Sequence, residues 1–448
     1  MTAEVLPQTA GAWHRRIWQL TWPVILANIT IPMVGVADVA VMGRLPDPAY
    51  IGAVAMGAAM FSAVYWLFGF LRMGTTGLAS QAFGRGDAGE IGEIFMRGLC
   101  VAAVLGLAIV LLQWPLAAML FALFDASSQV EGLAATYYDI RVYGAPALLI
   151  YLVELGVLFG LQRMRDTLLL SIALNVTNLG LDILLVVGLK MGVAGVALGT
   201  VISEWGAAAA GLWLVWRSLN AVGYNGRPAR DLWQIEAVKG LFHVSSNLVL
   251  RTFFVQLPFF AGTVVATRLG DTTLAAHGVL MQLFFVMTYS LDGFAHTAET
   301  LAGFAFGAKN RVALRHTTIY SSIWAMLLAL ATATLYWFAG DVFVAWLTLD
   351  ASIRIAASAY LPWLAAAPLL CVWAFLFDGI FIGTTHIVEM RNAMFAAAAV
   401  WAVCLWASLD SLGYHAIWLT MTIFMLVRSV LLALYYPRLE HGADPHAS

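Results

Sequence analysis

Residues 17–41 read IWQLTWPVILANITIPMVGVADVAV, a 25-residue run in which Asp38 is the single charged side chain. A helix needs about 20 consecutive, mostly apolar residues to cross the hydrocarbon core of a bilayer. The run is longer than the apolar core of a signal peptide, about 7–15 residues, and lacks a clear small-residue cleavage site. We therefore expect a retained membrane-spanning helix over residues 16–43.

The whole chain has the same apolar character as this run. Of its 448 residues, 62% are hydrophobic and 11% are charged, whereas soluble domains average about 45–50% and about 25%. This composition excludes a soluble enzyme and a disordered protein, and the net charge of -2 offers no basic field for nucleic acid. It predicts an all-α polytopic membrane protein in contact with membrane lipids.

Eleven further apolar runs, separated by polar or Gly/Pro breaks, bring the expected number of spans to twelve. They cover 50–80, 91–119, 130–160, 167–188, 192–217, 237–268, 273–304, 312–340, 352–384, 390–409 and 413–436. The longest polar stretch between spans, 218–236, lies at the middle of the chain. We therefore expect a six-helix bundle over 1–217, a cytoplasmic linker over 218–236, and a second six-helix bundle over 237–448.

The basic residues predict the orientation of these spans. Fifteen of the 23 Lys and Arg residues fall on the side that carries both termini, and four fall on the opposite side. Cytoplasmic loops carry an excess of Lys and Arg. Both termini are thus expected in the cytoplasm, with the chain in a bacterial inner (plasma) membrane.

The two halves resemble each other at a nearly constant offset. Leu78–Gly84 (LASQAFG) and Leu301–Gly307 (LAGFAFG) match at five of seven positions with an offset of 223, and Gly160 repeats as Gly383. Because six spans precede the second half, both halves enter the membrane in the same direction. Parallel repeats of this kind are typical of secondary transporters.

Several other classes of membrane protein lack support in the sequence. None of the three lysines is followed by Ser or Thr, as a phosphate-binding loop requires. The nine His are scattered, and Cys100, Cys371 and Cys404 have no paired spacing. We expect no enzymatic activity, no cofactor and no metal centre, and an ion gradient as the energy source.

Carboxylates inside spans are costly and usually functional. The candidates are Asp38, Asp139, Glu154, Asp182, Glu204, Asp292, Glu299 and Asp378. Of these, Asp139, Glu154 and Glu204 are interpreted as residues of structural pairs or span ends. Asp38 is a stronger candidate for coupling, because it follows Pro23 and Pro32 in the first span and proline bends or breaks a helix.

Asp182 is the second strong candidate. Asn178 lies four residues before it on the same helix face. Thr200 follows the glycine stripe Gly192, Gly195 and Gly199, which allows close helix approach near Asp182 or serves packing alone.

The repeat distinguishes these acids from architectural ones. Asp38 corresponds to Gly262 or Ala261, and Asp182 corresponds to a position near Leu405. Only the first half carries the pair, which favours an ion-coupling site there. Asp292 and Asp378 are second-bundle candidates, with Arg251 as a charge partner.

In combination these residues resemble the multidrug and toxic compound extrusion family. The resemblance rests on Pro23, Asp38 and Ala40–Leu45 (AVMGRL), on Gln81–Gly84 (QAFG), and on Asn178–Asp182 (NLGLD) and Gly192–Thr200 (GVAGVALGT). Leu291–Phe294 (LDGF), Ala305–Gly307 (AFG), Phe377–Gly383 (FDGIFIG) and Glu389–Asn392 (EMRN) are similar to its DNA-damage-inducible protein F-like branch.

This resemblance implies twelve helices in two bundles around a V-shaped cleft, a monomer, and export of organic, often cationic, compounds against H+ or Na+. It assigns the cation site to Asp38, Asn178, Asp182 and Thr200 and the helix bend to Pro23, with H+ favoured in this branch. Val34 stands where the family often has tyrosine.

Two questions remain open at this point. Tyr65, Trp66, Met287, Tyr289 and Phe294 are candidates to line the cleft, although packing or lipid contact is the simpler explanation for each of them taken singly. The alternatives to a proton-coupled drug antiporter are a Na+-coupled one, a flippase for a lipid-linked sugar, which would need several converging in-membrane arginines, and a non-transporting receptor or scaffold.

Overall fold

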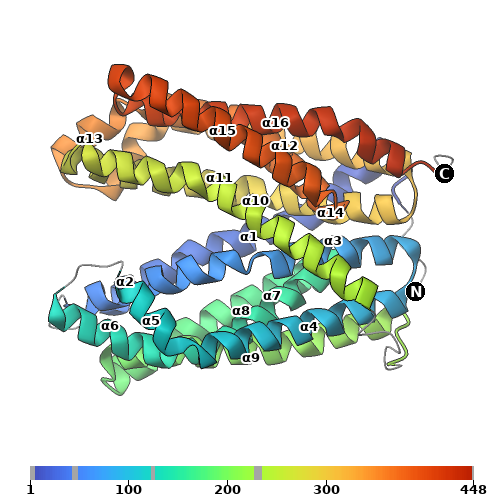
Figure 1. Cartoon of the computed structure of the whole chain (residues 1–448), viewed down its shortest axis with the longest axis horizontal. Coiled ribbons are helices and arrows are strands. Elements are labelled where there is room, and N and C mark those ends of the chain that lie inside the picture. Colours follow the sequence, from blue (N-terminus) through green and yellow to red (C-terminus); the bar gives the residue numbers. More distant parts are fainter. Residues whose placement is uncertain (1–5, 43–48, 123–126, 227–234, 446–448) are drawn as a thin grey trace. The chain divides into compact units, whose positions relative to one another are not determined.

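The computed structural model describes residues 6–42, 49–122, 127–226 and 235–445, and within these ranges the chain forms helices and turns without any strand. Their bounds are α1 (Ala10–Met42), α2 (Ala49–Leu67), α3 (Phe70–Arg85), α4 (Ala88–Leu111), α5 (Gln113–Phe121), α6 (Ser128–Arg141), η1 (Val142–Gly144), α7 (Ala145–Gly160), α8 (Met164–Asp182), η2 (Ile183–Gly188), α9 (Gly192–Ala221), α10 (Ile235–Arg268), α11 (Asp271–Gly307), α12 (Arg311–Leu347), α13 (Ala351–Ser358), α14 (Leu361–Gly383), α15 (Ile387–Leu412) and α16 (His415–Gly442) (Figure 1).

Eleven segments of the described chain are long and apolar enough to cross a membrane, and each coincides with one of the predicted spans after the first. Several consist of consecutive helices: α2 and α3 form Ala49–Arg85, and α6, η1 and α7 form Ser128–Gly160. With α1, which extends over 33 residues, they give the twelve long helical segments expected. The all-α polytopic fold is confirmed.

The chain divides into two compact units. One contains Leu26–Leu241, and the other combines Phe242–Ser448 with Glu4–Ile25. The sequence assigned all of residues 1–217 to the first bundle, whereas the first part of α1 has its contacts with the second. There Thr21 and Thr297 hydrogen-bond through their hydroxyls at 2.8 Å, and Trp324 Nε1 donates to His14 Nδ1 at 3.1 Å.

The predicted linker also differs in detail. The helix α9 continues to Ala221, so the first four residues assigned to the linker are helical. Residues 227–234 lie outside the described chain. The helix α10 begins at Ile235, close to the predicted start of the second bundle.

The internal repeat appears as two matching helix crossings. In the first unit, a Cβ added at Gly156 of α7 would lie 2.8 Å from the Arg72 carbonyl of α3. In the second unit, the Ala295 carbonyl of α11 occupies the place of a Cβ at Gly379 of α14. Arg72 and Ala295, like Gly156 and Gly379, are 223 positions apart, so both crossings depend on glycines that bring two backbones into contact.

Candidate functional site

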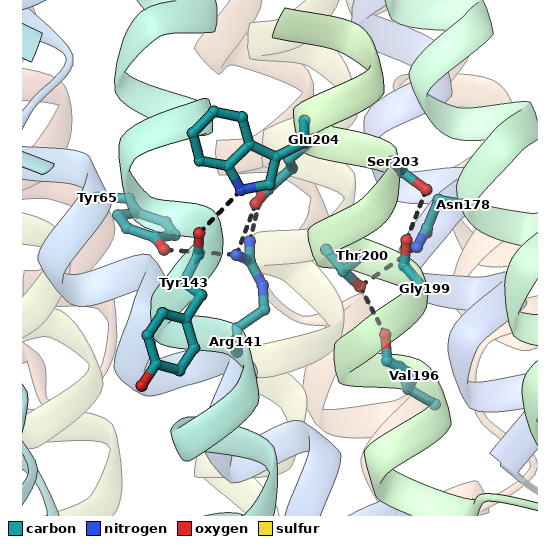
Figure 2. A network of polar contacts seen from close by, with 10 residues as sticks. Tyr65, Arg141, Tyr143, Asn178, Val196, Gly199, Thr200, Ser203 and Glu204 are labelled. Carbon is teal, nitrogen blue, oxygen red and sulfur yellow. Dashed lines mark hydrogen bonds and ion pairs between the residues drawn. The ribbon is translucent and has the colours of Figure 1, made fainter. Parts of the chain in front are cut away.

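The polar site of the first unit is built from α8 and α9. Asn178 Nδ2 donates to Thr200 Oγ1 at 3.2 Å, and the Thr200 hydroxyl donates to the Val196 carbonyl at 2.9 Å (Figure 2). Asp182, one turn after Asn178, is fully buried. The face predicted from the spacing of Asn178 and Asp182 therefore turns toward α9.

Close approach of the two helices depends on the glycine stripe. A Cβ at Gly199 would lie 2.6 Å from Asp182 Oδ1, and one at Gly195 would lie 3.2 Å from the Leu185 carbonyl carbon. The stripe thus serves packing and also brings the α9 backbone against the carboxyl group. Directly after Asp182 the helix widens into the π-helix η2, a local geometry frequent at functional sites.

Two predicted residues of the site lie on α1. Pro23 is buried, and the helix continues through it from Ala10 to Met42. Asp38 lies in the same helix, but its side chain is outside the described residues. The structure therefore brings together Asn178, Asp182 and Thr200, and the part of Asp38 in the site stays a prediction.

A hydrogen bond that the sequence did not indicate joins α1 to this face of α8. Asn175 Nδ2 donates to Thr30 Oγ1 at 2.6 Å, and the Thr30 hydroxyl donates to the Ala27 carbonyl at 2.7 Å. Asn175 precedes Asn178 by three residues, so both lie on one side of α8. The sequence signal for this contact is the three-residue spacing of Asn175 and Asn178 inside one span, which places two polar side chains on one side of the helix.

One turn after Thr200, α9 also carries a buried ion pair. Arg141 of α6 donates from Nη1 and Nη2 to Glu204 at 2.8 and 2.6 Å, and Nη1 lies 3.4 Å from the Tyr65 hydroxyl (Figure 2). The structural pair expected for Glu204 is confirmed. Asp139 is exposed, whereas Glu154 is fully buried and forms no pair among the described residues. The described residues therefore give Glu154 no structural pair.

The second unit places two arginines on one carboxylate. Arg251 of α10 and Arg428 of α16 both donate to Asp378 Oδ2 of α14, Arg428 at 2.5 Å. The predicted contact between Arg251 and Asp378 is present, and Arg428 joins it. Asp292 lies on α11 and is half-buried. Two guanidinium groups against one carboxylate leave one positive charge in excess.

Residues proposed to line a cleft have different environments. Met287 and Phe294 are 1% exposed and belong to the core of the second unit, so packing explains them. Tyr289 stacks on Phe285, and Trp66 is 51% exposed. Within the described residues no group of three or more His, Cys, Asp or Glu side chains is arranged to hold a metal ion.

Sequence comparison finds a family and full-length relatives. The model of the family described as MatE matches residues 23–184 and 248–407. The DNA damage-inducible protein F of Escherichia coli is 37% identical over 424 residues, covering 95% of this chain and 92% of that protein. A probable multidrug resistance protein NorM of Acinetobacter baylyi is 24% identical, with 95% and 96% covered.

Solved structures share the fold at low identity. The Vibrio cholerae MATE transporter VcmN in the bent form has a TM-score of 0.85 at 16% identity, covering 97% of this chain and 98% of that one. An outward-facing multidrug resistance MATE family transporter of the MOP superfamily has a TM-score of 0.82 at 20% identity, with 95% and 96% covered. These likenesses concern the fold alone.

Proposed function

The chain belongs to the MatE family, and from this premise we propose that it exports organic, often cationic, compounds by antiport against inward H+. The observation that carries the proposal is the fully buried Asp182 beside Gly199, one turn from the Asn178–Thr200 hydrogen bond. A carboxyl group that exchanges a proton between two conformations has to be shielded from water in at least one of them. The burial of Asp182 supports this role.

The proposed cycle uses Asp38 and Asp182 together. In the outward-facing state the two carboxyl groups take up a proton from outside, which removes negative charge from the site and rearranges α1. The rearrangement weakens substrate binding, and the proton then leaves to the cytoplasm as substrate binds again. A ligand shifts such an equilibrium only by its difference in affinity for the two states.

The neutral side-chain oxygens near Asp182 determine whether the site could bind Na+ as well as H+. The side chains of Asn178 and Thr200 offer oxygen ligands, which suit hard cations such as Na+. A proton needs one carboxyl oxygen, whereas Na+ needs several oxygens arranged around it. The proposal favours H+ and makes Na+ coupling an outcome of the test.

The alternative of a lipid-linked sugar flippase depends on converging, uncompensated arginines. Among the arginines far from the ends of the predicted spans, Arg141 is paired with Glu204, and Arg251 and Arg428 share Asp378. The guanidinium of Arg72 lies over the Phe159 ring at 5.5 Å. Each of these guanidinium groups is engaged by a side chain of its own unit, which favours drug export over the binding of a pyrophosphate. We place the transporter in an inner membrane as a monomer, with both termini in the cytoplasm.

Substrate-induced proton flux in proteoliposomes tests the proposal, measured with and without Na+. The wild type should move protons with an organic cation such as ethidium, and Asp38→Asn and Asp182→Asn should abolish the flux at normal expression. Asp166→Asn is the matched control, because Asp166 lies at the start of α8 beside Arg163. Normal proton-driven export by both Asn variants would exclude these carboxylates, and a strict Na+ requirement would exclude H+.

A further inference from the structure

Glu154 of α7 is buried without a hydrogen-bond or ion-pair partner in the part of the chain that the structure describes. Its side chain is fully buried, and neither carboxyl oxygen has a hydrogen-bond partner among the described residues. The carboxyl group lies against Gly211 of α9, where Glu154 Oε2 occupies the position that a Cβ would take. The absence of a side chain at Gly211 therefore makes the space in which this carboxyl group lies.

Two other buried carboxylates, Glu204 and Asp378, have arginine partners. Glu204, on the same helix as Gly211, accepts two hydrogen bonds from Arg141, and Asp378 accepts from two arginines. These acids are stable as anions because guanidinium groups compensate their charge. Glu154 has no such compensation, so its chemical state has to differ from theirs.

The charged and titratable groups on the helices around α7 are engaged elsewhere. Tyr151, one turn earlier on α7, interacts electrostatically with Glu154, but its hydroxyl is hydrogen-bonded to Ser171 of α8. The remaining groups are Arg72 over Phe159, the pairs Arg85–Glu90, Arg97–Glu93, Arg163–Asp166 and Arg141–Glu204, Arg217 over Trp213, the partly buried Cys100, the exposed Arg165 and Tyr143, and Asp182 in the site described above. None of them forms a hydrogen bond or ion pair with Glu154.

An isolated carboxylate in an apolar interior is far less stable than a neutral carboxylic acid in the same place. The neutral form leaves one hydroxyl without an acceptor, which is a much smaller penalty than an uncompensated charge. We propose that Glu154 is a second proton-binding site of the first bundle, occupied by a proton in this structure and emptied only when α7 and α9 separate around the carboxyl group.

The packing of α7 favours α9 as the side on which the carboxyl group of Glu154 would be uncovered. On the side of α4, a Cβ at Gly98 would lie 2.7 Å from Val153 Cγ1, and on the side of α3, a Cβ at Gly156 would lie 2.7 Å from Thr75 Cβ. In each of these contacts a glycine packs against a side chain of the neighbouring helix, which holds α7 against both α4 and α3. The α9 side is different, because there the ionisable group itself fills the contact.

The direction of the linkage follows from this geometry. Protonation of Glu154 stabilises the closed contact between α7 and α9, and loss of the proton stabilises any state in which water reaches the carboxyl group. The bound proton is a property of the bundle alone, whereas its use in transport rests on the proton-coupled antiport proposed above.

Infrared spectroscopy of the purified full-length protein tests the bound proton. The difference between wild type and Glu154→Gln at neutral pH should contain the carbonyl band of a protonated carboxylic acid. Glu93→Gln is the control, since Glu93 is ion-paired with Arg97 and should contribute no such band. Gln has the shape of the protonated acid, so the variant should fold normally. A difference spectrum without the band would overturn the proposal.

Alkaline titration tests whether this proton can leave. The band should weaken as the pH rises, and the thermal stability of the wild type should fall relative to that of Glu154→Gln. A band that persists to the highest pH at which the fold survives would also overturn the proposal. If the band titrates while the wild type shows no substrate-induced proton flux, the proton site stands and the antiport mechanism fails.

Discussion

Arg141 and Glu204 form a two-point ion pair in the interior of the first unit, with Nη1 to Oε2 at 2.8 Å and Nη2 to Oε1 at 2.6 Å. The parallel geometry of the two hydrogen bonds satisfies both partners, which single-point pairs do not achieve. The guanidinium also lies 5.2 Å from the centre of the Phe61 ring. This pair joins α6 to α9 next to the candidate coupling site.

Removing one member of the pair should be much worse than removing both. Glu204→Gln leaves a buried, uncompensated guanidinium, and we expect a loss of about 3–5 kcal/mol of stability. The double variant Arg141→Met/Glu204→Leu replaces both charges with apolar side chains and should recover most of that loss. Thermal unfolding of the three proteins in detergent measures the effect. Equal destabilisation by the single and double variants would contradict a charge-based explanation.

Gly199→Ala tests the close approach of α9 to Asp182. The new methyl group would lie 2.6 Å from Asp182 Oδ1 and has to displace the carboxyl group or the helix. We expect transport to fall about tenfold or more, which corresponds to a cost of about 1.4 kcal/mol at the site. Gly206→Ala, on the same helix with nothing within 4 Å of the added Cβ, should transport normally. Similar activity in the two variants would mean that the α9 backbone does not position Asp182.

The cluster at Asp378 predicts unequal effects for the loss of Arg251 and the loss of the Asp378 charge. Arg251→Gln removes the excess positive charge and leaves the Arg428–Asp378 pair, so its effect on stability should be below about 1 kcal/mol. Asp378→Asn leaves two guanidinium groups without an anion and should destabilise by about 3–5 kcal/mol. Thermal unfolding again provides the measurement. A larger loss in Arg251→Gln than in Asp378→Asn would show that the excess charge is not unfavourable.

The extent of prediction from sequence differs between the fold and the site. Apolar runs locate each of the eleven later spans, because the thickness of a bilayer imposes a minimum length on every helix that crosses it. The offset of 223 also identifies glycines that make equivalent crossings in the two halves, such as Gly156 and Gly379. Both signals extend over many residues, so an error of several residues at the end of a predicted span does not remove them.

The sequence could not predict which residues on distant helices pair with each other. Nothing in the local pattern distinguishes Glu204, which has an arginine 63 residues away, from Glu154, which has no partner among the described residues. The local sequence likewise does not indicate the hydrogen bond between Asn175 and Thr30, which are 145 residues apart and lie on two different helices. Helix rotation decides these contacts, and rotation depends on packing over the entire bundle.

Asp350 provides a pH-dependent prediction outside the membrane-spanning segments. It caps α13: its Oδ1 accepts hydrogen bonds from the Ser352 hydroxyl at 2.6 Å and from the Ser352 and Ile353 amides, and these bonds lower the pKa of the carboxyl group. A lowered pKa in the folded state means that the cap stabilises α13 above the unfolded-state pKa and loses this effect as the pH falls through the folded-state pKa. Amide hydrogen exchange in α13, corrected for intrinsic rates, should therefore accelerate at acid pH. Asp350→Asn keeps a capping side chain without a titrating group, so its exchange should not show this pH dependence. Identical pH profiles in the two proteins would contradict the proposed role of the carboxylate.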